Sequence, residues 1–494
     1  MKTETGRIQK VLITLTAAAF VIACSSGGNG GALNNPPPPG TGGIIGSGVS
    51  IGPIDNFGSI FVHGRELDTS AATFTKDGQP ASETDFRVGQ IVTRTGTFDA
   101  NGVSGTADSV TYDDNVEGEI TSIDIMNSQF EVLGQTVLVN PTQVIFDDDI
   151  NPRSLTGLMV GDIVEVSGFV TAAGDIQATR IELQPAGTEF EVTGVIATGS
   201  LDTTAMQFNI NALVVDYSAA MLDNFPGGTP AEGDLVEAKG NSLGAGNELL
   251  ATRIEWKNPD LPGVEDDEIE LEGLISLFVS PVDFRVAGNP VTTNSQTQYE
   301  NGTESDLMDD VLVEVKGQLD AMGVLVAREI DFEQNSDVEI EATADANGSG
   351  TTITILGITV NKNNSTRMED KRDNVMQFDI PDIMMGDFLH IVGFEDAPGS
   401  GNVTATRIER EDFDPDVVLQ GTATTAVEPN IVILGVSGIT DAATQYFDEN
   451  EAVIADPAMD FWPNAANRTV KIKDDAAVLG VPPVLDIDEA ELEN

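Results

Sequence analysis

The chain has 494 residues, enough for several small domains, and its 24 basic against 81 acidic residues give a formal net charge of −57. A surface this acidic repels phosphate backbones and anionic lipid headgroups, so the composition argues against a nucleic-acid-binding protein. The single cysteine excludes an intramolecular disulfide, and stability must therefore come from packing.

Residues 1–23 are typical of a secretory signal peptide. Three basic residues precede the apolar run 11–23, which is too short to span a bilayer. The run ends in Val-Ile-Ala directly before Cys24, and this segment resembles a bacterial lipobox. The resemblance implies that Cys24 is lipidated and holds the protein on a membrane. Ser25 after it implies the outer membrane of a Gram-negative bacterium. The alternative is a plain signal peptide with an incidental cysteine.

Residues 24–46 are rich in Gly, Asn, Pro and Ser and include four consecutive prolines at 36–39. Such a segment cannot bury a core, so we predict a disordered Gly/Pro tether between the lipid and the first folded part.

The rest of the chain repeats one pattern. Each copy opens with a short strand that carries glycine or alanine at 52, 118, 194, 273, 342 or 421, so successive copies begin 66 to 79 residues apart. Repeats this long indicate tandem small domains rather than a thin solenoid. We predict β units at 47–112, 116–183, 191–256, 269–332 and 338–410, a divergent unit at 417–475, and an acidic tail at 476–494.

Five of the six copies contain an apolar-variable-apolar strand that ends in a turn glycine, as in 130–134, and five contain a closing hairpin, as in 158–183. In that hairpin Val164 and Val166 alternate with polar residues, and Gly168 and Gly174 mark the turn. About five short strands per copy predict an all-β array of small barrels or sandwiches. Units this small are individually marginal, so we expect neighbours to pack together. The sixth copy lacks the closing Ala-Thr-Arg-Ile-Glu motif.

These motifs resemble the bacterial domain of unknown function 5666. The resemblance covers residues 47–410, more weakly to 475, and is carried by Gly118, Ile120, Phe130, Val132, Gly134, Val160, Gly161, Asp162, Val164, Val166, Gly168, Ala178 and Ile181. It implies small OB-like barrels, similar to oligonucleotide/oligosaccharide-binding barrels, and no catalytic residues. The first copy departs from the pattern at Gln90, where the family has Asp, and the fourth at residues 310–311.

Two motifs suggest catalysis only at first sight. His63 and His390, the two histidines of the chain, occupy different positions in different copies, a turn and an outward strand position, which argues against a shared metal or acid/base site. Residues 48–52 spell the Gly-x-Ser-x-Gly pattern of a nucleophile elbow. That motif needs a strand before it and a helix after it, whereas here a Gly/Pro linker precedes it and Pro53 follows.

Acidic runs are the remaining candidates for a site. Asp147, Asp148 and Asp149 offer the oxygen ligands that calcium prefers, as do the runs 113–117 and 265–270. No EF-hand loop is present, and solvated acidic loops are the alternative. Three arginines share one position of the closing strand, and we predict local salt bridges for them rather than a repeated ligand contact: Arg180, Arg253 and Arg407.

Together these features predict a lipid-anchored, non-enzymatic cell-envelope protein that serves as a structural or interaction module and needs no cofactor. Its expected partners are the membrane and an envelope protein or polysaccharide. The alternative is a carbohydrate- or calcium-binding surface lipoprotein, although four Tyr and two Trp argue against a repeated aromatic sugar platform. An enzyme of unknown class is the third possibility.

Overall fold

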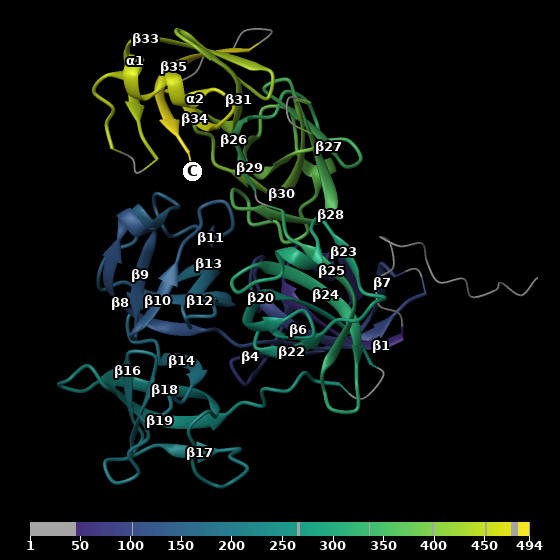
Figure 1. The fold of residues 1–494 in the computed structure, drawn as a ribbon, viewed down its shortest axis with the longest axis vertical. Helices are drawn as coiled ribbons and strands as arrows, with labels where there is room; N and C mark the ends of the chain where they lie inside the picture. The colour runs from purple at the N-terminus through teal and green to yellow at the C-terminus, as the bar shows by residue number, and fades with distance from the viewer. Residues whose placement is uncertain are drawn as a thin grey trace, which may run out of the picture. The chain divides into compact units, whose positions relative to one another are not determined.

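The computed structural model describes residues 46–100, 102–263, 267–334, 336–397, 400–449, 452–475 and 483–493. The predicted signal peptide 1–23, the predicted lipidation site Cys24 and nearly all of the tether lie outside these ranges. The regular structure of the described residues is almost entirely β-strand, which confirms the predicted all-β class. The strands form six small barrels in chain order, numbered 1 to 6 (Figure 1).

The strands of the first three barrels have the following bounds. Barrel 1 contains β1 (Gly46–Pro53), β2 (Ile60–Val62), β3 (Arg65–Asp68), β4 (Thr73–Lys76), β5 (Gln79–Ala81), β6 (Ile91–Phe98) and β7 (Ser104–Tyr112). Barrel 2 contains β8 (Val116–Asp124), β9 (Gln129–Val132), β10 (Gln135–Leu138), β11 (Ile145–Phe146), β12 (Ile163–Val170) and β13 (Ile176–Gln184). Barrel 3 contains β14 (Phe190–Val195), β15 (Gln207–Ile210), β16 (Leu213–Asp216), β17 (Met221–Asp223), β18 (Leu235–Leu243) and β19 (Leu249–Trp256).

The second half of the array follows the same order. Barrel 4 contains β20 (Glu268–Ser280), β21 (Asp283–Val286), β22 (Asn289–Thr292), β23 (Gln298–Glu300), β24 (Leu312–Leu319) and β25 (Leu325–Phe332). Barrel 5 contains β26 (Val338–Thr343), β27 (Thr352–Ile355), β28 (Ile358–Asp370), β29 (Phe388–Glu395) and β30 (Asn402–Glu411). Barrel 6 contains β31 (Val417–Val427), β32 (Asn430–Ile433), β33 (Val436–Phe447), the helices α1 (Pro457–Asp460) and α2 (Trp462–Ala465), β34 (Thr469–Asp474) and β35 (Val484–Leu492).

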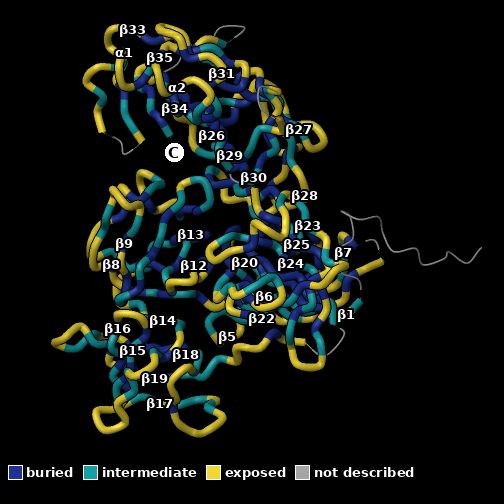
Figure 2. Tube along the Cα trace, viewed as in Figure 1, coloured by how far each residue is buried: buried dark blue, intermediate teal, exposed yellow. Residues whose placement is uncertain are grey.

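The strands of each barrel wrap around its alternating apolar residues, and in barrels 2, 4 and 6 paired strands close a complete ring. In barrel 2 the ring runs β8, β9, β10, β13, β12 and back to β8, with a parallel pairing only between β10 and β13. Val164 and Val166 point inward and are fully buried. Figure 2 shows the same contrast along the chain, with buried positions in the strands and exposed positions in hairpin tips and loops. Closure pairs the strand edges that would otherwise invite aggregation.

One packing contact connects the glycine of the opening strand with the residue before the turn glycine of the repeat. The residue before the turn glycine has a left-handed backbone, with φ of 46° at Leu133, and its side chain lies over the glycine of the opening strand. A Cβ on Gly118 would lie 2.6 Å from Leu133 Cγ, and one on Gly52 would lie 2.2 Å from His63 Nε2. The opening strand therefore needs glycine because the turn residue occupies the space of a side chain.

The closing hairpin explains two more motif residues. In barrels 1 to 5 its register shifts at the glycine, which is the mark of a β-bulge. A Cβ on Gly168 would lie 2.4 Å from the carbonyl oxygen of Gln177. The Thr179 hydroxyl donates a hydrogen bond of 3.0 Å to the carbonyl oxygen of Ser167 at the bulge. The Thr of the Ala-Thr-Arg motif thus satisfies a backbone group that the bulge leaves unpaired.

The barrels are joined in pairs through their opening strands, and we call each junction a seam. Strand β8 pairs with β14 and β26 pairs with β31, so barrels 2 and 3 share a sheet and so do barrels 5 and 6. Each of these pairs also shares one hydrophobic core. Barrel 1 pairs instead with barrel 4, through a parallel contact between β1 and β20. Packing between sequence neighbours therefore holds for two pairs, and the third pair joins distant repeats.

The sixth barrel extends further than expected. We expected an acidic tail at 476–494, but Val484–Leu492 forms β35, the closing strand of this barrel. Strand β35 pairs with β34 and β33, and it buries Leu485, Ile487 and Leu492 while its acidic residues alternate outward. High acidity concealed an alternating strand pattern. Within the described ranges, no helix has the length and apolarity to cross a membrane.

Candidate functional site

Histidine and carboxylate side chains gather at the three seams. In the part of the chain that the structure describes, four groups bring three such residues to within 4.8 Å of one another: His63, Glu270 and Glu314; Glu339, Glu341 and His390; His390, Glu409 and Glu411; and Asp77, Asp114 and Glu191. The predicted metal candidates Asp147, Asp148 and Asp149 belong to none of these groups. Asp148 lies 3.1 Å from Arg153 Nη2. Calcium binding at 147–149 stays a prediction.

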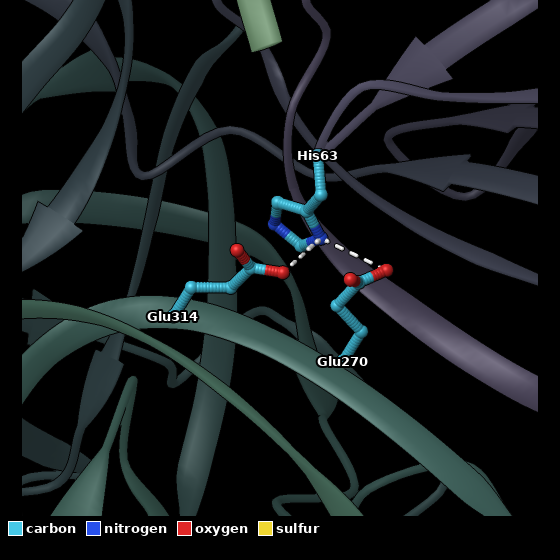
Figure 3. Close-up of side chains that lie close together, drawn as sticks. All are labelled: His63, Glu270 and Glu314. Atoms are coloured by element: carbon cyan, nitrogen blue, oxygen red, sulfur yellow. Dashed lines mark ion pairs between the residues drawn. The ribbon is translucent and has the colours of Figure 1, made fainter. Parts of the chain in front are cut away.

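The His63 cluster, formed by His63, Glu270 and Glu314, lies at the seam of barrels 1 and 4 (Figure 3). His63 belongs to the turn between β2 and β3, whereas Glu270 comes from β20 and Glu314 from β24. Its Nδ1 atom lies 3.4 Å from Glu270 Oε2 and 3.8 Å from Glu314 Oε1. On the other side of the ring, Nε2 lies 3.3 Å from Glu272 Oε2. The imidazole is thus enclosed by carboxylates of the partner barrel.

These carboxylates fix the charge of the ring. Burial opposes a charged imidazole, but Glu314 and Glu270 outweigh it and raise the pKa of His63 to about 10. Burial also opposes the Glu270 carboxylate, yet Arg65, with Nη2 2.7 Å from Oε1, and His63 hold the pKa of Glu270 well below its usual range. Burial and the Glu270 charge raise the pKa of Glu314 well above its usual range. These shifts favour an imidazolium at His63 and a carboxylate at Glu270.

This charge state disfavours a metal. An imidazolium uses both ring nitrogens as donors and has no lone pair for an ion, and metal binding would have to displace its proton. Arg65 already neutralises Glu270, and Lys316 Nζ lies 3.3 Å from Glu314. The cluster is therefore an internally balanced ion-pair network.

The same geometry bears on the nucleophile-elbow pattern at 48–52. Ser50 Oγ does lie 3.4 Å from His63 Nδ1, so the motif serine and a histidine meet in space. However, Ser50 is fully buried on β1, and its hydroxyl oxygen accepts a hydrogen bond of 3.1 Å from Arg94 Nη2. A charged imidazole cannot accept the serine proton, so this arrangement lacks a general base.

A cavity of about 340 Å³ opens beside the His63 cluster. Titratable side chains line it, including Asp55, Glu272, Glu333 and Arg367. Burial raises the pKa of Asp55 to about 7 and that of Glu333 to about 8. Both groups can therefore exchange protons near neutral pH, and this cavity is where a polar ligand would meet them.

The second histidine has a similar setting in another barrel pair. His390 on β29 lies 3.0 Å from Glu339 of β26 through Nε2 and 3.0 Å from Glu409 of β30 through Nδ1. Glu339 Oε2 also forms an ion pair of 2.7 Å with Lys471 Nζ of barrel 6, so the network lies at the seam of barrels 5 and 6. Burial opposes the charged ring, but hydrogen bonds to Glu339 and Glu409 raise the pKa of His390 to about 10. None of the four groups contains both histidines.

The closing-strand arginines act both locally and between barrels. Arg253 binds Asp223 at 2.7 Å and Glu255 at 3.1 Å, both in its own barrel, as predicted. Arg180 has a local partner in Glu182 at 3.3 Å, but it also reaches Glu369 of barrel 5 at 3.1 Å. The sequence argument missed this second role because repeat alignment says nothing about contacts between barrels. Arg407 likewise donates to carbonyl oxygens of barrel 2.

Two of the acidic runs proposed as calcium sites each contribute one residue to these clusters. The run 113–117 contributes Asp114, and the run 265–270 contributes Glu270, while residues 265 and 266 lie outside the described ranges. Sequence reasoning missed Asp77 and Glu191. For Glu191 the signal was a repeated acidic position three residues before the Gly or Ala of the opening strand, at Glu191, Glu270 and Glu339, whereas Asp77 lies in a turn outside this pattern.

Comparison with known proteins gives one family match. The family model described as "Domain of unknown function (DUF5666)" matches residues 117–182, 272–331 and 339–409, which lie in barrels 2, 4 and 5. Three segments of the chain are thus similar to this family. Barrels 1, 3 and 6 share the strand order of the matched segments without matching the family model themselves.

The other comparisons add little. No curated protein matches the chain. A solved structure entitled "drosophila Unr CSD456" aligns with 15% identity over 36% of this chain and 84% of that chain, with a TM-score of 0.14. A TM-score this low supports no inference for the barrels of this chain.

Proposed function

We propose that this chain is a lipid-anchored, non-enzymatic repeat protein of the bacterial cell envelope that serves as a structural or interaction module. The single observation that carries the proposal is that the residues of the repeat motif build the barrel scaffold. Its glycines make room for a turn side chain and for a bulge, and its threonine binds a bulge carbonyl. Its apolar residues fill the barrels. A motif that builds the scaffold leaves no repeated reactive group.

The ionic clusters support the same proposal. The two histidines carry protons and are held by carboxylates, and the one serine-histidine contact is buried and lacks a base. Catalysis at such a site would need a group with a free lone pair beside an accessible substrate. These clusters instead fix which barrels join, which is the task of a structural array.

Lipid anchoring rests on the sequence before the described residues. Metabolic labelling with an alkyne-modified fatty acid, followed by membrane fractionation, tests it directly. We expect the wild-type protein to be labelled and to sediment with the outer membrane. Cys24→Ser should be unlabelled and should leave the membrane fraction, while Ser25→Ala should behave as wild type. Labelling that survives Cys24→Ser would refute the anchor.

The non-enzymatic part of the proposal has its own test. A fluorophosphonate probe reacts with activated serines, so we expect no labelling of the folded protein above that of Ser50→Ala. Labelling that disappears in Ser50→Ala would overturn the argument that His63 cannot act as a base. The measurement is independent of the anchor, so the two parts of the proposal can fail separately.

A further inference from the structure

The seam of barrels 2 and 3 differs from the other two in its charge. Strand β8 pairs with β14 so that Glu117 faces Glu191. Asp77, in the turn between β4 and β5 of barrel 1, reaches the same place. Its backbone N–H donates to the carbonyl oxygen of Tyr112 at 2.9 Å, and the backbone N–H of Asp114 donates to Asp77 Oδ1 at 3.2 Å. Three barrels thus bring acidic side chains to one point, where oxygen atoms of Asp77, Asp114 and Glu191 lie within 4.8 Å of one another.

Asp114 is the unusual member of this group, which we call the Asp114 cluster. The residue is only 2% exposed, and neither carboxylate oxygen has a hydrogen-bond donor among the described residues. Glu191 is similar in part. Its Oε2 accepts a hydrogen bond of 2.5 Å from Lys239 Nζ, whereas its Oε1 has no hydrogen-bond partner among the described residues. Three buried carboxylate oxygens therefore lack a partner at one point. Such groups are costly unless something binds them.

The surrounding charges do not balance these carboxylates. The carboxylates at this seam outnumber the ammonium groups by six to three: Asp77, Asp114, Glu117, Glu165, Glu191 and Glu237 against Lys76, Lys239 and Lys257. In the His63 and His390 clusters, by contrast, the carboxylates pair with a histidine and with an arginine or lysine. The Asp114 cluster must take up protons or a cation.

We propose that Asp77, Asp114 and Glu191 bind a divalent cation of the calcium class. All three offer hard oxygen ligands and none offers nitrogen or sulfur, which favours calcium over zinc or copper. Oxygen atoms within 4.8 Å of one another can share one calcium ion, because ligands on opposite sides of it, each about 2.4 Å away, lie about 4.8 Å apart. Three carboxylates from the protein favour calcium over magnesium, which is usually held by one or two carboxylates and keeps several waters. Such an ion would neutralise the seam and tie barrels 1, 2 and 3 together.

Thermal unfolding of the purified protein tests the site. Wild type is compared in chelator, in calcium and in magnesium at constant ionic strength, with each ion at about 5 mM, above the ~10⁻⁴–10⁻³ M dissociation constants of extracellular calcium sites. We expect calcium to raise the Tm by a few degrees and magnesium to do much less. Calorimetry should give one calcium site per chain at this seam.

Asp114→Asn provides the sharpest comparison. Since it removes a buried, unpartnered charge, we expect it to raise the Tm in chelator and to abolish the calcium response. Asp149→Asn, in the acidic run outside the cluster, should retain the full response. If Asp114→Asn does not fold, Glu191→Gln should fold and weaken calcium binding at least about tenfold.

Four results would overturn the proposal. An equal calcium response in wild type and Asp114→Asn, or equal responses to calcium and magnesium, would mean that ions merely screen an acidic surface. Loss of the response in Asp149→Asn would move the site elsewhere. No response in wild type would mean that protons alone fill the cluster.

Discussion

Replacing Gly118 by alanine tests the contact that links two glycine positions of the repeat. The new Cβ would lie 2.6 Å from Leu133 Cγ, whereas carbon atoms in ordinary contact are about 3.5–4.0 Å apart. Leu133 is only 3% exposed, so it has little room to withdraw. Overpacking of this kind costs about 1–3 kcal/mol, partly offset by the roughly 0.5–1 kcal/mol that alanine gains over glycine in a strand. We expect Gly118→Ala to lower the free energy of unfolding of barrel 2 by about 1–2 kcal/mol.

A double-mutant cycle separates this clash from a general effect of the substitution. Leu133→Ala alone should cost about 2–5 kcal/mol because it truncates a buried side chain. Combined with Gly118→Ala it should cost less than the sum, by about 1 kcal/mol, since the clashing atoms are gone. Gly227→Ala is the matched control, because a Cβ there meets nothing within 4 Å. We expect it to be neutral or stabilising by less than about 1 kcal/mol.

Hydrogen exchange followed by mass spectrometry is the suitable assay, because it reports local opening of β8–β13 in a protein of six barrels whose global unfolding need not be two-state. Strictly additive costs in the cycle would refute the packing explanation. So would a Gly118→Ala variant whose exchange matches that of Gly227→Ala. Either result would leave the opening-strand glycine without a steric cause.

Three further predictions concern single interactions. The folded pKa of His390, about 10, lies above its unfolded value of 6.5, so its stabilising effect is complete below pH 6.5 and is lost as pH rises towards 10. At about 1.4 kcal/mol per pH unit this contribution reaches about 5 kcal/mol, so the Tm of wild type should fall more steeply across this range than that of His390→Gln. Arg65→Met should cost about 3–5 kcal/mol because it removes the cation 2.7 Å from the buried Glu270 and leaves only His63, at 3.4 Å, beside it; adding Glu270→Gln should restore part of the Tm, and no restoration would contradict the pairing. Thr179→Val should cost about 1 kcal/mol in urea unfolding by removing the hydrogen bond to the bulge, whereas Thr156→Val, at an exposed position, should cost almost nothing.

Features that depend on neighbouring residues along the chain could be predicted from the sequence. The alternation of Val164 and Val166, the turn glycines and the bulge glycine all act within one hairpin or one barrel, and the all-β array follows from them. Strand β35 was missed although it alternates equally well, because its outward positions are acidic and the composition suggested a tail. For this strand, the alternation of apolar and polar residues predicts the structure better than the acidic composition does.

The clusters could not be predicted in the same way, because they depend on contacts between barrels. Glu165, Glu237, Glu314 and His390 share one strand position, which faces outward from a single barrel. Pairing of the barrels covers that face, so Glu165 is 4% and Glu237 1% exposed. Nothing in one repeat says that β1 pairs with β20, more than 200 residues later. Acidic residues that a single repeat presents to solvent thus become buried ion pairs.

Buried charges at the seams also explain why barrel 1 joins barrel 4 rather than barrel 2, its neighbour in sequence. The opening strands of the barrels are similar in their apolar residues, so hydrophobic contact alone would not discriminate among them. Arg65 of barrel 1 meets Glu270, three residues before Gly273 of barrel 4, at 2.7 Å. The corresponding residue of barrel 2, three before Gly118, is Asn115, which would leave the guanidinium buried without a carboxylate. An unpaired buried charge costs several kcal/mol, enough to reject the wrong partner. This position therefore favours barrel 4 over barrel 2, whereas barrels 3 and 5, with Glu191 and Glu339 there, would also offer Arg65 a carboxylate.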